Sequence, residues 1–102
     1  MPMPRFTETL KRLVLGELRK LRITAQVGFK SLGQTRVFRM YVIASAFRLM
    51  RYTERQELVW RIVRSACSET QLSQISMIVT ATPSEIQDDE DAPPSVIAPR
   101  RR

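Results

Sequence analysis

The chain has 102 residues, of which 43% are hydrophobic and 26% are charged, so one small globular domain is expected. It contains no histidine and one cysteine, which excludes an ordinary triad base, an internal disulfide and a cysteine-rich metal cluster. The net charge is +7, and residues 1–64 hold fourteen lysines or arginines against four glutamates, which favours contact with polyanions.

The first predicted element is an amphipathic helix over residues 6–21. Apolar residues recur there at intervals of three and four, from Phe6 to Leu21. Gly16 interrupts the pattern, which suggests close packing against a neighbouring sheet. A mitochondrial presequence is the alternative interpretation of this basic segment. No apolar run approaches the roughly 20 residues that cross a bilayer, so no membrane span is expected.

Two strands are predicted next. From Ile23 to Phe29 apolar and polar residues alternate, as in a strand with one buried face. The run from residue 37 to Phe47 is apolar on both alternating sets, which indicates an interior strand covered on both faces. The two strands form an antiparallel hairpin with Gly33 near its tip.

A second helix is predicted to start at Thr53. Gln56 lies three residues later, so the two side chains are expected to form a reciprocal capping box, and Gln56 is interpreted as a helix cap. An apolar stripe from Leu58 to Ala66 follows, and the helix should end between Ser65 and Ser68.

The last third of the chain holds a short helical turn within residues 68–74 and then a third strand over residues 75–82. Pro83 limits that strand. We therefore expect one α+β domain over residues 1–86, in the order helix, strand, strand, helix, strand, with the helices on one face of a three-stranded sheet. Residues 87–102 are acidic, proline-rich and then basic, which predicts a disordered tail that folds back onto the basic face.

Several residues resemble the BolA family, whose domain has this element order and a type II KH-like architecture. A strand ending at Phe47 precedes Arg55 by eight positions, and Val59 and Trp60 follow, similar to the family's Ser-x-x-Phe and Arg-His-x-x-Val-Tyr patterns. The segment with Thr82, Pro83 and Glu85 resembles the family's threonine-proline-acidic strand ending. The resemblance covers about residues 7 to 86.

The chain departs from the family at the position that matters for metal chemistry. The resemblance implies a histidine after the arginine, able to ligate an iron–sulfur cluster shared with a monothiol glutaredoxin. This chain has Gln56 there, and an amide is a poor iron ligand compared with an imidazole or a thiolate. No cofactor and no metal ligand are therefore predicted.

The candidate binding residues are the arginines of the second strand and second helix together with the glutamine at the helix start: Arg36, Arg39, Arg55, Gln56, Arg61 and Arg64. Arg12, Arg19 and Lys20 of the first helix extend this basic surface. Arg55 is expected either to hold the loop after Phe47 or to face a partner. Arg36, Phe38, Arg39 and Tyr41 form a basic and aromatic sequence that is typical of a base-stacking surface, with strand core as the alternative.

These features predict a non-enzymatic BolA-like adaptor or regulator that binds a protein or a nucleic acid in the cytoplasm. The alternative is an iron–sulfur trafficking partner of a monothiol glutaredoxin that has lost the family histidine. A third hypothesis is an enzyme that uses Cys67, whose pKa the nearby Arg64 would lower.

Overall fold

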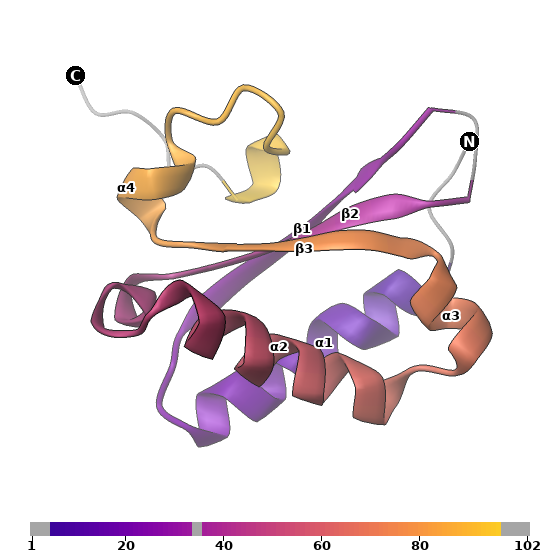
Figure 1. The fold of residues 1–102 in the computed structure, drawn as a ribbon, viewed down its shortest axis with the longest axis horizontal. Helices are drawn as coiled ribbons and strands as arrows, with labels where there is room; N and C mark the ends of the chain where they lie inside the picture. The colour runs from indigo at the N-terminus through magenta and orange to yellow at the C-terminus, as the bar shows by residue number, and fades with distance from the viewer. Residues whose placement is uncertain (1–4, 34–35, 97–102) are drawn as a thin grey trace.

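The computed structural model describes residues 5–33 and 36–96 as an α+β domain built on a three-stranded mixed sheet (Figure 1). Its elements, in chain order, are α1 (Phe6–Lys20), β1 (Ala25–Ser31), β2 (Phe38–Ala44), the 3₁₀ helix η1 (Ser45–Leu49), α2 (Tyr52–Ala66), α3 (Glu69–Ser73), β3 (Ile75–Ala81), α4 (Pro83–Ile86) and the 3₁₀ helix η2 (Pro94–Val96). The principal helices and strands follow one another as predicted. In the described part of the chain, no helix combines the length and apolar character that a bilayer span requires.

The sheet has β2 at its centre, paired antiparallel with β1 and parallel with β3. The antiparallel pair is the predicted hairpin, and β2 is buried along almost its whole length, as its apolar sequence predicts. Because β2 and β3 run in parallel, the chain must cross from one end of the sheet to the other between them, and α2 and α3 supply that crossover.

The main core lies between one face of the sheet, here called the inner face, and the two long helices (Figure 1). Every second residue of β2, from Phe38 to Ala44, points into this core and is at most 2% exposed. The side chains of Leu10, Val14 and Leu18 of α1 pack into the same core. This burial accounts for the three- and four-residue spacing of the apolar residues in that helix.

The outer face of the sheet carries a second, smaller core. Tyr41 and Ile43 of β2 pack there with Ile86 of α4 and with Ala92 and Val96. Figure 1 shows α4 and the following segment on the side of the sheet opposite α1 and α2. The prediction of helices on one face therefore describes α1 and α2 but not α4.

Residues 87–96, predicted to start a disordered tail, lie against the outer face, and Val96 is only 1% exposed. The remainder of that tail lies outside the described residues. Gly28 of β1 allows this contact, since a Cβ atom there would lie 2.7 Å from Ser95 Oγ and 2.8 Å from Val96 Cγ1. Such distances are too short for carbon, so the segment can approach β1 closely only where a side chain is missing.

Some local predictions are wrong. β2 ends at Ala44, three residues before Phe47, because the chain turns into η1 and carries the Phe47 ring into the main core. Nothing lies within 4 Å of a Cβ atom built on Gly16, so the predicted close packing at that glycine is absent. β1 starts at Ala25, two residues later than predicted, because Arg22 adopts a left-handed conformation with φ 63° that ends α1.

Candidate functional site

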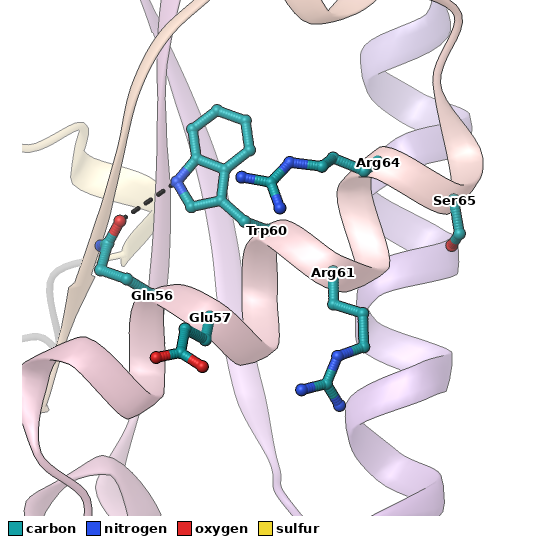
Figure 2. Close-up of a pocket in the computed structure, with 6 residues that line it drawn as sticks. All are labelled: Gln56, Glu57, Trp60, Arg61, Arg64 and Ser65. Carbon is teal, nitrogen blue, oxygen red and sulfur yellow. Dashed lines mark hydrogen bonds between the residues drawn. The ribbon is translucent and has the colours of Figure 1, made fainter.

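A hollow with a volume of about 670 Å³ lies along α2. Six residues of α2 line it: Gln56, Glu57, Trp60, Arg61, Arg64 and Ser65. Figure 2 shows Gln56, Trp60 and Arg64 along the same side of the helix, which follows from their spacing of four residues.

Gln56 ties α2 to β3. Its Nε2 atom donates to the backbone oxygen of Ile78 at 2.8 Å and to Thr80 Oγ1 at 3.1 Å. Its Oε1 atom accepts from Trp60 Nε1 at 3.1 Å, the bond drawn in Figure 2. Both the nitrogen and the oxygen of the Gln56 side-chain amide are therefore hydrogen-bonded.

The prediction that Gln56 caps α2 is wrong. The helix begins at Tyr52, one residue before Thr53, and the side chain of Glu54 accepts a 2.7 Å bond from the backbone N–H of Arg51. A carboxylate is a stronger acceptor at a helix start than an amide, because the helix dipole favours negative charge there. Gln56 consequently lies inside the first turns of α2 and faces the sheet.

Arg64 and Trp60 form a cationic and aromatic pair at the centre of the hollow. The guanidinium carbon of Arg64 lies 5.5 Å from the centre of the indole ring, within the range of a cation–π contact. Arg61 and Arg64 are exposed, and neither forms an ion pair with an acidic residue in the described ranges. Glu57 lines the same hollow, so two arginines against one glutamate leave this part of α2 with a net positive charge beside an aromatic surface.

Arg55 has a structural position. It is 7% exposed, donates from Nε to the backbone oxygen of Met50 at 3.2 Å, and pairs through Nη1 with Glu85 Oε1 at 2.9 Å. The first of these bonds holds the loop that follows Phe47, one of the two roles expected for Arg55 from the sequence. Hydrogen bonds from the backbone N–H of Thr82 and from Arg55 hold the pKa of Glu85 below its ordinary value.

The two arginines of the hairpin lie away from α2. Arg36 is exposed, whereas Arg39 points to the outer face of the sheet and donates from Nη1 to the hydroxyl of Tyr41 at 3.2 Å. The rings of Phe38 and Tyr41 are fully buried in the two separate cores, so the predicted base-stacking surface is not exposed. The strand-core alternative is the correct one for both aromatic residues.

In the described ranges no three histidine, cysteine, aspartate or glutamate side chains gather in a way that holds a metal ion. Gln56 and Cys67 are eleven positions apart, about 16 Å of helical rise. Burial raises the pKa of the Cys67 thiol, so the lowered pKa proposed from the proximity of Arg64 is wrong.

Sequence reasoning misses two residues of these surfaces, Trp60 and Lys30. Trp60 enters the sequence analysis only as part of a family pattern, although its spacing from Gln56 and Arg64 signals a shared helix face. Lys30 Nζ lies 3.3 Å from Asp91 Oδ1, 61 positions away. The sequence predicts that the acidic tail folds back onto the basic face, but no local pattern identifies Lys30 as its partner.

Comparison of the chain with protein-family models, with curated proteins and with solved structures finds no match.

Proposed function

We propose that this chain is a non-enzymatic BolA-like adaptor or regulator that binds an anionic partner, a nucleic acid or an acidic protein, through the surface of α2. The observation that supports the proposal most is the hollow beside Trp60, where Arg61 and Arg64 are exposed and lack acidic partners in the described chain. The resemblance of residues 7 to 86 to the BolA family agrees with this class of function, and the single cysteine favours a cytoplasmic location.

An aromatic ring beside two unpaired guanidinium groups suits a polyanion better than a neutral ligand. Arginine contributes paired hydrogen bonds to phosphate or carboxylate, and an indole offers a flat face for a base or an apolar side chain. Gln56 fixes the orientation of the indole by accepting its N–H, which lowers the entropy cost of binding at this position.

The iron–sulfur alternative has less support. A monothiol glutaredoxin is a candidate protein partner in this proposal, but the amide of Gln56 is hydrogen-bonded to β3 and to Trp60 and offers no ligand. Anaerobic mixing with a monothiol glutaredoxin tests this point. We expect the natural chain to leave the visible absorption of the glutaredoxin cluster unchanged, and new absorption bands would favour the alternative.

The experiment for the main proposal uses a labelled single-stranded oligothymidylate and, in a second arm, labelled poly-glutamate. Fluorescence anisotropy of the label gives the affinity at low salt, and the emission of Trp60, the single tryptophan of the chain, reports the location. We expect one of the two polyanions to bind and to change the Trp60 emission.

Arg61→Ala together with Arg64→Ala should weaken that binding about tenfold. The matched control is Arg12→Ala with Arg19→Ala, two exposed arginines of α1 that the sequence groups with this basic surface but that do not line the hollow. Their loss changes the net charge equally. We expect the control to have a clearly smaller effect. Equal effects of the two double variants would show that α2 is not the binding surface.

A further inference from the structure

The outer face of the sheet holds a second basic feature, separate from α2. Lys30 of β1 and Arg39 of β2 are direct cross-strand partners. Like charges that face each other across two strands repel and destabilise the pair, so strand pairing alone does not explain this arrangement. An anion placed between the two cations removes the repulsion.

The chain itself supplies such an anion. Asp91 Oδ1 lies 3.3 Å from Lys30 Nζ, and Asp91 Oδ2 lies 4.0 Å from Arg39 Nη1. The hydroxyl of Tyr41 accepts from Arg39 and donates to the backbone oxygen of Asp91 at 3.3 Å. One carboxylate therefore bridges both cations in the way that a phosphate oxygen pair does.

The electrostatics of Arg39 agree with an anion at this place. The hydrogen bond to Tyr41 raises the pKa of Arg39 above its ordinary value, and the carboxylates of Asp91 and Asp89 raise it further. The Nε atom of Arg39 is buried and has no hydrogen-bond partner in the described structure.

The contact made by Asp91 is weak enough to be replaced. The Asp91 side chain is 68% exposed, and exposed ion pairs contribute little net stability. The adjoining apolar part of the segment is held differently, since Ala92 and Val96 are buried against Tyr41 and Ile43. The Asp91 side chain can thus leave Lys30 and Arg39 while Ile86, Ala92 and Val96 keep the segment on the outer face.

Beyond the cations, the same row of the sheet continues to an apolar side chain. Met77 of β3 is the cross-strand partner of Arg39 and is 46% exposed. A row of two cations followed by an exposed thioether offers charge for a phosphate and an apolar contact for the base attached to it.

From this geometry we infer that Lys30 and Arg39 form a phosphate-binding site for single-stranded nucleic acid on the outer face, and that Asp91 occupies it in cis as an internal competitor. The inference rests on the proposed function in one respect, because it takes the nucleic acid as the anionic partner. The site itself is separate from α2, and so is its test.

The test is a titration of the isotope-labelled full chain with a single-stranded oligothymidylate at low salt. Amide signals of Gly28, Lys30 and Arg39 report the outer face, while the Trp60 emission reports α2. Asp91→Asn should tighten binding about threefold, the size expected for removal of one exposed competing ion pair. Glu90→Gln is the matched control, because Glu90 is exposed in the same segment and its substitution changes the net charge equally. We expect it to have little effect.

Lys30→Ala should weaken binding about threefold and should abolish the gain from Asp91→Asn in the combined variant. Three results would each overturn the inference. Asp91→Asn and Glu90→Gln could change the affinity equally, or Asp91→Asn could change the stability without changing the affinity. The chain could also bind poly-glutamate but not the oligonucleotide. Shifts on the outer face with an unchanged Trp60 emission would support the inference and would leave poly-glutamate as the remaining test ligand for α2. A Trp60 response without shifts on the outer face would overturn the inference and support the α2 proposal. The absence of any response would overturn the inference, and the α2 proposal would fail as well if poly-glutamate also leaves the Trp60 emission unchanged.

Discussion

Replacement of Gln56 by alanine tests the link between α2 and β3 directly. The substitution removes the two bonds donated to Ile78 and Thr80 and the bond accepted from Trp60. A neutral hydrogen bond contributes about 1 kcal/mol net, and water replaces part of the loss because Gln56 and Trp60 are only partly buried. Thr80, at 2% exposed, loses a partner that water does not easily replace. The expected loss of stability is therefore about 2 kcal/mol.

Urea unfolding measures this loss. With a denaturant dependence of about 2 kcal/mol per molar for a domain of this size, the midpoint should fall by about 1 M. Glu57→Ala is the matched control, because Glu57 is the neighbouring exposed position of the same helix and should change stability by less than about 0.5 kcal/mol. If the two variants unfold at the same urea concentration, Gln56 does not connect the helix to the strand.

Three further predictions concern other parts of the domain. Glu85→Gln should lower the free energy of unfolding at neutral pH, and the difference from the natural chain should shrink as pH falls below about 4.3. The reason is that a carboxylate with a lowered folded-state pKa stabilises the fold only above the ordinary pKa. Urea unfolding across pH checks this, and a pH-independent difference would contradict it. Cys67 should react with an aromatic disulfide reagent more slowly in the folded chain than in urea, because burial raises its thiol pKa, and equal rates would refute that cause. Gly28→Ala should force Val96 away from β1 and speed amide exchange in residues 87–96, whereas unchanged protection would show that the close approach is not required.

The capping motifs show what local sequence can and cannot predict. Thr53, Ser68 and Thr82, each near the start of a helix, are among the serines and threonines that are followed three residues later by glutamate or glutamine. It forms a reciprocal cap at Ser68 with Gln71 and at Thr82 with Glu85, but not at Thr53. At the start of α2 the side chain of Glu54 accepts from the backbone N–H of Arg51 instead. A motif alone therefore does not fix where a helix starts when a stronger hydrogen-bond acceptor lies nearby.

The sheet was more predictable than the site. The apolar sequence on both faces of β2 correctly indicated a central strand, since periodicity is a property of neighbouring residues. The functional contacts instead join residues far apart in sequence: Gln56 reaches Ile78, Arg55 reaches Glu85, and Lys30 reaches Asp91. Tertiary packing determines such contacts. The local sequence pattern therefore points to Thr53 as the partner of Gln56, whereas the structure places that partner on β3.

The salt dependence of oligonucleotide binding is the most direct test of the claim that α2 is a polyanion-binding surface. Each phosphate contact with a single strand contributes a slope of about −0.7 to the plot of log affinity against log salt. Removal of Arg61 and Arg64 should therefore make the slope shallower by about 1.4, while removal of Arg12 and Arg19 should leave it nearly unchanged. Equal slopes for the natural chain and the α2 variant, or no binding at low salt, would contradict the claim.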